Sequence, residues 1–339
     1  MRVARPLAAL ALPLSAVLAL SACGGDAEAD AAGSTDDAGT VSFTWDRNVN
    51  AADEDADPQL EETTVEVPKN PENIVVFDMA SLDTIGALGG EVSGAPLDSV
   101  PGYLEDALAD DAYDVGTLFE ADLIEIESQQ PDLIIIGGRS SALYDDLSEI
   151  APTVDLSLRG TYTENLERNV TFLGEVLGAE DEAAAAIADV EEGIEEARAA
   201  TADAGTGLGL MVSGGELSAM APAGEGSDAR AARGGLIYDA FGVEPVVDDI
   251  KAATHGEPVS FEFLLETNPD YLWVVDRDAA TGEAGAQAAQ AVLDNDIVAQ
   301  TTAAENDQIV YLDPTAWYIV FGGIETTKIM IDDVLQIAG

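Results

Sequence analysis

From residue 70 to its end, the chain alternates short apolar runs with longer segments of helical periodicity. Near-continuous apolar runs, such as Leu133–Ile136, are typical of strands buried on both faces of a parallel sheet. The predicted strands are Ile74–Phe77, Leu133–Ile136, Thr153–Leu156, Leu208–Ser213, Tyr271–Val275 and Ile309–Leu312. The predicted helices are Ser81–Leu88, Leu123–Gln129, Ala142–Ile150, Thr163–Leu177, Gly235–Phe241, Phe261–Glu266, Ala284–Asp294 and Ile324–Ile337. Because strands and helices alternate, the sequence predicts a layered α/β fold.

One long segment, from Asp181 to Asp203, interrupts this alternation. It is rich in alanine and glutamate and lacks proline, and as a helix it would be about 35 Å long. Its apolar stripe is mostly alanine, so we expect a helix that joins two lobes and not one in a packed core. The predicted lobes are residues 41–180 and 204–339, and the linking helix spans residues 181–203.

The two halves share a local pattern. Gln130-Pro131-Asp132 and Asn268-Pro269-Asp270 each follow a helical segment and precede a buried strand. This pattern indicates one supersecondary unit used twice. Ligands of open α/β sheets bind beyond the carboxyl ends of the strands, so we expect the functional site in the loops that follow the strands.

The amino end predicts export. Residues 1–22 combine a basic start, an apolar run and a small-residue end, which is typical of a signal peptide. Leu20-Ser21-Ala22-Cys23 resembles a bacterial lipobox, whose cysteine is acylated and becomes the first residue of the mature protein. An ordinary signal peptide cut near Ala22 is the alternative. Residues 23–40 contain almost nothing to bury and predict a flexible tether, so we expect an extracytoplasmic protein, lipid-anchored to the outer face of the cell membrane.

Two β-prone runs follow the expected tether. They are Val41–Trp45 and Thr63–Val67, and they flank an acidic insert at residues 50–62. We expect the two runs to pair as a hairpin with an irregular, solvated loop.

The composition is 47% hydrophobic, which indicates a globular protein, but the formal net charge is −53. There are 66 aspartates and glutamates against 13 lysines and arginines and 1 histidine. Such a surface repels nucleic acid and anionic lipid, so neither is an expected partner. Cys23 is the only cysteine, which leaves no intrachain disulfide and no cysteine-based metal site. Adaptation to high salt and a habit of the lineage both remain explanations of the acidity.

Three of the few cations lie at predicted strand or helix ends. Arg139 follows the strand at 133–136, Arg277 follows the strand at 271–275, and Arg233 precedes the helix at 235–241. Local ion pairing is the alternative for each, most clearly for Arg277, which has aspartates on both sides. Arginines gathered at one cleft suit a planar or multiply charged anion, because each guanidinium can form paired hydrogen bonds.

His255, the only histidine, lies in an irregular stretch, and Tyr318 lies between the last strand and the last helix. A solvated or capping histidine and a packing tyrosine are the ordinary interpretations. Imidazole and phenolate are both acceptable donors to Fe(III), however, and the cation stabilises the phenolate far below its free pKa of about 10. The two side chains are therefore candidate iron ligands.

Long motifs in both halves give the chain a resemblance to a known family. The motifs are Asn73–Ile85, Val115–Glu120, Pro131–Arg139, Arg233–Asp239, Thr254–Glu262, Asn268–Arg277 and Pro314–Tyr318. Residues 65–339 resemble the class III binding proteins for ferric catecholate siderophores, the petrobactin-like group within the larger ferric-siderophore and cobalamin receptor family. The resemblance implies an α/β fold of two Rossmann-like lobes with mostly parallel central sheets, joined by one long rigid helix, with limited closure around ligand.

The resemblance also implies roles for five residues. Arg139, Arg233 and Arg277 match three arginines that cradle the anionic catecholates, whereas His255 and Tyr318 match side chains that complete iron coordination when the siderophore supplies only four donors. A bis-catecholate leaves two of six octahedral positions open, which one imidazole and one phenolate would fill. A hexadentate siderophore would need only the arginines. The iron(III)–siderophore complex is the expected ligand, with no permanently bound cofactor.

A further implication is delivery of the ligand, by a monomeric binding protein, to the permease subunits and ATPase of an ABC importer. In that family one glutamate on each lobe docks to the permease, and Glu262 matches in the carboxyl-terminal lobe. The amino-terminal position is Ile124, a departure that leaves Glu125 or Glu120 to provide the contact. A solvated helix residue is the alternative interpretation of Glu262.

Other functions remain open from the sequence. A Ser-His-Asp hydrolase would need His255 as its base, but no Gly-x-Ser-x-Gly motif and no second histidine occur, so we expect no enzyme. The same fold with haem, cobalamin or a hydroxamate siderophore as cargo is an alternative, although a hydroxamate complex carries less negative charge. An adhesion or sensing lipoprotein would lack a closed ligand cleft.

Overall fold

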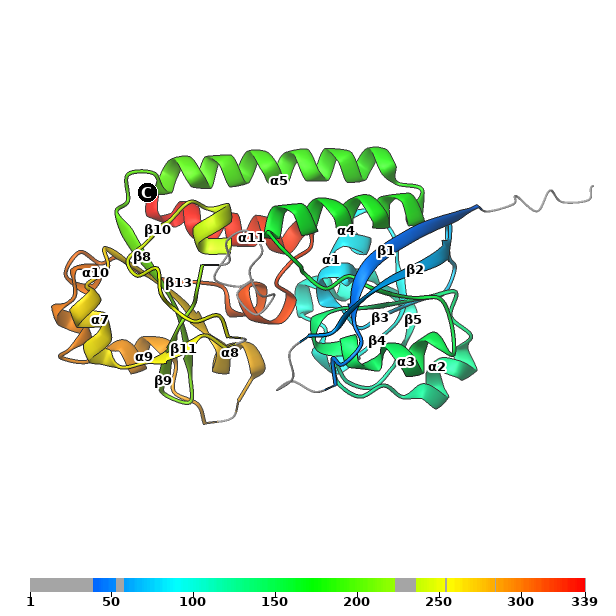
Figure 1. Cartoon of the computed structure of the whole chain (residues 1–339), viewed down its shortest axis with the longest axis horizontal. Coiled ribbons are helices and arrows are strands. Elements are labelled where there is room, and N and C mark those ends of the chain that lie inside the picture. Colours follow the sequence, from blue (N-terminus) through cyan, green and yellow to red (C-terminus); the bar gives the residue numbers. More distant parts are fainter. Residues whose placement is uncertain (1–38, 53–57, 223–235, 254, 284, 339) are drawn as a thin grey trace, which may run out of the picture. The chain divides into compact units, whose positions relative to one another are not determined.

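The computed structural model describes residues 39–338 except 53–57, 223–235, 254 and 284 (Figure 1). The described residues belong to one compact unit. The predicted signal peptide, Cys23 and nearly all of the predicted tether lie outside the described residues, as does Arg233. Within the described ranges, no helix combines the length and the apolar character needed to cross a membrane.

The first half contains a five-stranded parallel sheet with the strand order β5–β4–β3–β6–β7. The strands are β3 (Ile74–Val76), β4 (Val92–Ala95), β5 (Leu108–Asp114), β6 (Leu133–Ile136) and β7 (Thr153–Asp155). Every residue of β3 and β6 is buried, which explains their unbroken apolar runs. The predictions of β3, β6 and β7 are confirmed, whereas β4 and β5 were missed because they are rich in small and polar residues.

Helices and turns connect these strands. They are α1 (Met79–Ala87), η1 (Leu97–Ser99), η2 (Gly102–Ala107), α2 (Leu123–Gln129), η3 (Gly138–Leu143), α3 (Tyr144–Ser148) and α4 (Tyr162–Leu177). The predicted helix at 142–150 is wrong in its extent, because a 3-10 turn that begins at Gly138 precedes α3.

The second half contains a mixed sheet with the strand order β11–β9–β8–β12–β13, and β10 pairs with β8. The strands are β8 (Thr206–Ser213), β9 (Glu216–Ala219), β10 (Glu244–Pro245), β11 (Glu257–Val259), β12 (Tyr271–Asp276) and β13 (Ile309–Tyr311). The strand β12 lies parallel to both of its neighbours, whereas β9 is antiparallel to both of its own. The short strands β9, β10 and β11 were not predicted.

The helices and turns of this half include two π-helical turns, η5 and η7. The elements are η5 (Leu236–Ala240), α7 (Phe261–Thr267), α8 (Arg277–Thr281), α9 (Ala289–Leu293), η6 (Val298–Gln300), α10 (Thr302–Glu305), η7 (Thr315–Val320), α11 (Ile324–Leu335) and η8 (Gln336–Ala338). The predicted helix at 284–294 is shorter than expected, because the helical residues there begin at Ala289.

A long helix, α5 (Glu180–Thr201), runs beside α4 of the first half and α11 of the second half (Figure 1). Its 22 residues give a length of about 33 Å. The buried face is narrow and carries small or branched side chains, among them Ala183, Val190 and Ile194. The expected α/β fold with a long connecting helix is confirmed, while the expected domain boundaries stay a prediction.

The predicted hairpin is present as β1 (Thr40–Asn48) and β2 (Leu60–Pro68), which pair in antiparallel register. Its inner face packs on the first half of the chain. The ring of Phe43 lies 4.4 Å from that of Phe172, and the ring of Trp45 lies 5.7 Å from that of Tyr144, measured between centroids. The hairpin therefore belongs to the packed core and is not part of a flexible leader.

The repeated Gln/Asn-Pro-Asp pattern corresponds to one structural unit used twice. The helices α2 and α7 each have 7 residues and end in a left-handed residue, Gln130 at φ 53° and Asn268 at φ 48°. The aspartate that follows each proline accepts main-chain hydrogen bonds: Asp132 from the amide of Asn73 at 2.9 Å, and Asp270 from that of Thr206 at 2.8 Å. The two halves are thus built on one local plan.

The last helix is tied to the first by a buried carboxylate. Asp83 on α1 accepts hydrogen bonds from the amides of Glu325 and Thr326, both at 2.8 Å, and from Thr326 Oγ1 at 2.6 Å. The side chain is 1% exposed, and this burial raises the pKa of Asp83 to about 6, although the hydrogen bonds oppose the shift.

Asp83→Asn should change how stability depends on pH. Because the pKa of Asp83 in the folded chain lies above its ordinary value of 3.8, the group contributes stability below that value and loses it as pH rises through about 6. The wild-type free energy of unfolding, minus that of the variant, should therefore rise by about 2.4 kcal/mol between pH 7 and pH 4. Urea unfolding at several pH values measures this difference, and a difference that does not vary with pH would contradict the assignment.

Candidate functional site

Four of the five expected ligand-binding residues lie together, three of them in helical turns that follow strands. Arg139 lies in η3 after β6, Arg277 begins α8 after β12, and Tyr318 lies in η7 after β13. His255 precedes β11. Because β6 belongs to the first sheet and the other strands to the second, the site draws on both halves. Arg233 lies outside the described residues, so its place in the site stays a prediction.

The phenol of Tyr318 connects the other three side chains. Its Oη accepts a hydrogen bond from Arg277 Nε at 2.8 Å and lies 3.2 Å from His255 Nε2. The imidazole and phenol rings are stacked, with centroids 6.3 Å apart. The guanidinium carbons of Arg139 and Arg277 each lie 5.5 Å from the centre of the phenol ring. The grouping that the family resemblance implied is therefore present for these four residues.

Arg139 contacts the backbone that carries Tyr318. Its Nη2 donates to the carbonyl of Tyr318 at 2.6 Å, and its Nη1 donates to the carbonyl of Ile319 at 3.0 Å. Burial lowers the pKa of Arg139, while the nearby Tyr318 and Asp78 favour the charged form. The side chain stays a cation, because arginine is not deprotonated in proteins. Arg139 is thus both a positive charge and a bridge between the halves.

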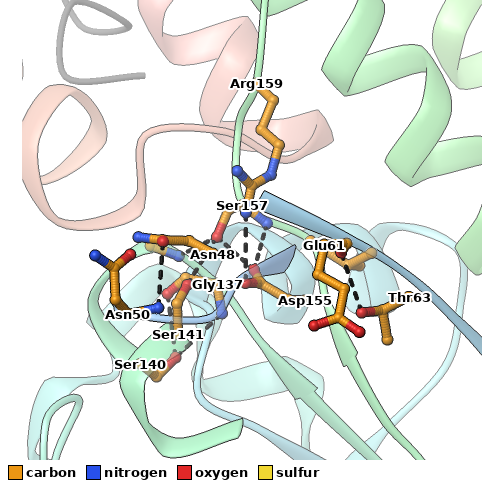
Figure 2. Close-up of polar contacts among 12 residues, drawn as sticks. Asn48, Asn50, Glu61, Thr63, Gly137, Ser140, Ser141, Asp155, Ser157 and Arg159 are labelled. Carbon is orange, nitrogen blue, oxygen red and sulfur yellow. Dashed lines mark hydrogen bonds and ion pairs between the residues drawn. The ribbon is translucent and has the colours of Figure 1, made fainter. Parts of the chain in front are cut away.

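Side chains at the end of β7 fix the loop that carries Arg139 (Figure 2). The amide of Gly138 donates to Ser157 Oγ at 2.7 Å, and Ser141 Oγ lies 3.0 Å from the same atom. Ser157 in turn hydrogen-bonds to Oδ1 of Asp155, which is 2% exposed, while Oδ2 of Asp155 lies 3.9 Å from the Arg159 guanidinium. This network restrains the backbone on which Arg139 is placed.

Arg277 is held by a second network. Its Nη1 donates to Ser213 Oγ at 2.9 Å, and Ser213 Oγ donates to Asp278 Oδ1 at 3.0 Å. Asp278 is 3% exposed and also accepts the amide of Gly214 at 2.6 Å. The hydrogen bond to Tyr318 raises the pKa of Arg277. The guanidinium of Arg277 is therefore oriented by Ser213, and Ser213 is fixed in turn by the buried carboxylate of Asp278.

The two site arginines differ from most other cations in the described residues. The lysines and arginines that form ion pairs there are Arg47, Lys69, Arg159, Arg198, Lys251 and Lys328. Neither Arg139 nor Arg277 is among them, so the local pairing that the sequence allowed for Arg277 is wrong for the aspartates beside it. Asp276 instead accepts the amide of Ala279 at 3.0 Å as the N-cap of α8.

The expected docking residues lie on the repeated helices. Glu262 is exposed in the first turn of α7, whereas Glu125 on α2 is partly buried and accepts a hydrogen bond from Gln129 Nε2 at 2.7 Å. Ile124 occupies the position on α2 that Glu262 occupies on α7, and it is 82% exposed.

Several residues that shape the site were not predicted from the sequence. Ser213, Asp278, Asp155 and Ser157 orient the two arginines, but none lies in a motif that marks its role. The only signal was position, because Ser213 ends β8 and Asp155 ends β7, and strand ends on one sheet edge converge.

Elsewhere in the described residues, the structure contains two cavities and no metal-binding cluster. No group of three or more histidine, cysteine, aspartate or glutamate side chains in those ranges is arranged to hold a metal ion. One cavity of about 310 Å³ lies between β1 and α4, beside Phe43 and Arg168, and another of about 390 Å³ lies beside Asp294 and Tyr311. Neither is lined by the four clustered residues.

The fold and these residues define a periplasmic binding protein. The family model with that description matches residues 74–316, and the chain belongs to this family of extracytoplasmic substrate-binding proteins. Over 280 residues the chain is 38% identical to the petrobactin-binding protein YclQ of Bacillus subtilis, a match that covers 81% of this chain and 85% of that protein.

Two solved structures are similar along nearly their whole length. A TroA-like periplasmic binding protein from Xylanimonas cellulosilytica is 71% identical with a TM-score of 0.85, and the match covers 88% of this chain and 99% of that one. The periplasmic catecholate-siderophore binding protein VctP from Vibrio cholerae is 30% identical with a TM-score of 0.75, covering 87% of this chain and 100% of that one.

Arg139→Ala should destabilise the protein more than loss of an exposed lysine. The variant leaves two carbonyl acceptors without their charged donor, so we expect a loss of about 2–3 kcal/mol in the free energy of unfolding. Lys251→Ala is the control, because its side chain is 84% exposed and its ion pair with Glu257 is long, so we expect a loss within about 1 kcal/mol. Denaturant titration measures both, and equal losses would show that the bridge contributes no stability.

Proposed function

We propose that the chain captures an iron(III)–siderophore complex of the catecholate class and delivers it to an ABC importer, without catalytic turnover. The observation that carries this proposal is the gathering of two arginines, outside any ion pair with a described carboxylate, around an imidazole and a phenol in a chain of net charge −53. The relatives support it, since YclQ is named for petrobactin and VctP for catecholate siderophores.

The chemistry of each group fits such a ligand. A ferric catecholate complex keeps negative charge on oxygens that guanidinium groups bind through paired, charge-assisted hydrogen bonds. A tetradentate siderophore leaves two coordination positions of iron open, and Tyr318 and His255 supply one oxygen and one nitrogen. Binding of iron releases the phenol proton to solvent, and the metal stabilises the resulting phenolate.

Ligand binding also redistributes the hydrogen bonds of Arg277. In the structure this guanidinium donates to Tyr318 Oη, the atom that would bind iron. When the phenol oxygen binds iron, the catecholate oxygens would offer Arg277 another acceptor. The hydrogen bond from Arg277 Nη1 to Ser213 Oγ would be kept, because it does not involve the phenol.

Tyr318→Phe and His255→Ala should separate two classes of siderophore. Each variant removes one proposed iron donor, so we expect affinity for tetradentate ferric bis-catecholates to fall about 10–100-fold and affinity for hexadentate complexes to change little. The buried Trp273 and Trp317 report binding through fluorescence quenching, and the ferric absorption band reports the phenolate.

Tyr311→Phe is the matched control, because Tyr311 lies on β13 and outside the cluster. Equal loss of both classes of complex in Tyr318→Phe would reject the ligand assignment. Wild-type protein that binds haem, cobalamin or ferric hydroxamates in preference to catecholates would reject the proposed cargo.

The proposal extends to the membrane. It includes an acylated Cys23, which lies outside the described residues, and a monomer that meets the permease subunits through Glu262 and Glu125. The support for these steps is the lipobox-like sequence and the exposure of Glu262 on α7.

Glu262→Ala should impair delivery and leave capture intact. A docking glutamate contributes only when the permease is present, so ligand affinity should stay unchanged while ligand-dependent ATPase stimulation in proteoliposomes falls about tenfold. Glu125→Ala should have the smaller effect, because that carboxylate already accepts a hydrogen bond from Gln129. Glu266→Ala, another exposed glutamate on α7, is the control, and a loss as large as that of Glu262→Ala would argue against a specific contact.

A further inference from the structure

The segment that carries Tyr318 is held by the first half of the chain, although it lies near the carboxyl end. Arg139 donates to the carbonyls of Tyr318 and Ile319, and Asp83 accepts from the first turn of α11. Two tyrosines of the first half add hydroxyl contacts to that turn. Tyr103 Oη lies 2.7 Å from Thr326 Oγ1, and Tyr162 Oη lies 2.7 Å from Thr327 Oγ1.

The turn between η7 and α11 fits closely against α1. Phe321, Gly322 and Gly323 have φ values of 47°, 147° and 82°, so three consecutive residues lie outside the ordinary region for L-amino acids. A Cβ on Gly322 would lie 2.9 Å from Ala80 Cβ, and one on Gly323 would lie 2.6 Å from Asp83 Cβ. Glycine at both positions therefore allows the backbone to approach α1 closely enough for Asp83 to reach the amides of α11.

The segment between the amino end of α11 and the phenol of Tyr318 is held by hydrogen bonds. The amide of Phe321 donates to the carbonyl of Ala316 at 3.0 Å, which closes the turn of η7 around Tyr318. The indole of Trp317 donates to Asp333 Oδ2 at 2.9 Å, which ties η7 to α11 itself. A shift of the α11 amino end is therefore transmitted to Tyr318 through hydrogen-bonded backbone and not through a loose loop.

The partners of the phenol belong to the second sheet. Arg277 follows β12 and is supported by Ser213 of β8, while His255 precedes β11. Consequently the contact of Tyr318 Oη with Arg277 and His255 joins a segment anchored on α1 to residues anchored on the second sheet. The position of the phenol depends on how α1 and α11 are joined.

We infer that Asp83 is a positioning residue for Tyr318, which it serves by holding the amino end of α11 against α1. In this role Asp83 helps to decide whether ferric complexes that need a protein phenolate are accepted. The inference rests on the proposed function, in which Tyr318 completes the coordination of iron. A carboxylate suits the position, because the unpaired amides at a helix start carry partial positive charge.

Asp83→Asn tests the inference with two measurements. We expect affinity for tetradentate ferric bis-catecholates to fall about tenfold or more, and affinity for hexadentate complexes to stay within about threefold, as for an outer residue that orients a metal ligand. A purely structural role would lower both affinities together. The second measurement needs no ligand: 3-fluorotyrosine placed at position 318 should show a shifted or broadened ¹⁹F resonance in the variant.

Asp270→Asn is the matched control. Like Asp83, Asp270 accepts main-chain and threonine hydroxyl hydrogen bonds, from the amide and Oγ1 of Thr206 at 2.8 and 3.1 Å, although it accepts one amide where Asp83 accepts two. It lies at the start of β12 and away from Tyr318. We expect neither the selectivity nor the ¹⁹F resonance to change in this variant. Thr326→Val is a milder second test, because it removes only the hydroxyl that links Asp83 and Tyr103. We expect its affinity for tetradentate ferric bis-catecholates to fall about threefold.

The outcomes separate the inference from the proposed function. If the wild-type protein binds no ferric catecholate, the proposed function fails, and the ¹⁹F resonance alone decides the positioning role. An unchanged resonance in both Asp83→Asn and Thr326→Val overturns the inference. So does an equal loss of tetradentate and hexadentate complexes. If Asp83→Asn does not fold, the two measurements on Thr326→Val decide.

Discussion

The two hydrogen bonds from Arg139 to the carbonyls of Tyr318 and Ile319 are the contact on which the site depends most. They place a cation of the first half against the backbone of the second half, and they orient the ring that meets Arg277 and His255. A lysine would not reproduce this contact, because only the planar guanidinium offers two donors in a fixed fork. The same side chain thus provides charge for a ligand and geometry for its neighbour.

Arg139 and Arg277 matter electrostatically because the chain carries few positive charges and a large negative net charge. Among the described residues of this acidic chain, most lysines and arginines form an ion pair with a carboxylate, as Arg47 and Lys328 do. Arg139 and Arg277 instead bond to carbonyls, a hydroxyl and a phenol, which satisfy their donors without cancelling their charge. An anionic ligand therefore meets a positive site in a strongly negative molecule, and the contrast favours anions that present several oxygens at once.

The sequence predicted the parts of the fold that carry strong apolar runs. Strands such as β6 and β12 are buried on both faces and appear as unbroken Leu, Ile and Val, whereas β4 and β9 contain small and polar residues that resemble loops. Arg139 and Arg277 stood out because strand ends converge, and family motifs mark all four described site residues. Asp83 lies within one of these motifs, but its role could not be predicted, since its partners lie 242 and 243 residues away and only the folded chain brings them together.

The helices α2 and α7 carry different residues, Ile124 and Glu262, at matching positions, and this difference affects how a partner can orient the protein. The two helices share length, end geometry and the following Pro-Asp unit, so a partner that recognised only this shared plan could bind either helix at the same contact. Ile124 on one helix and Glu262 on the other remove that ambiguity. The helix α2 presents an exposed apolar side chain and α7 presents an exposed carboxylate, so binding through one helix differs in energy from binding through the other.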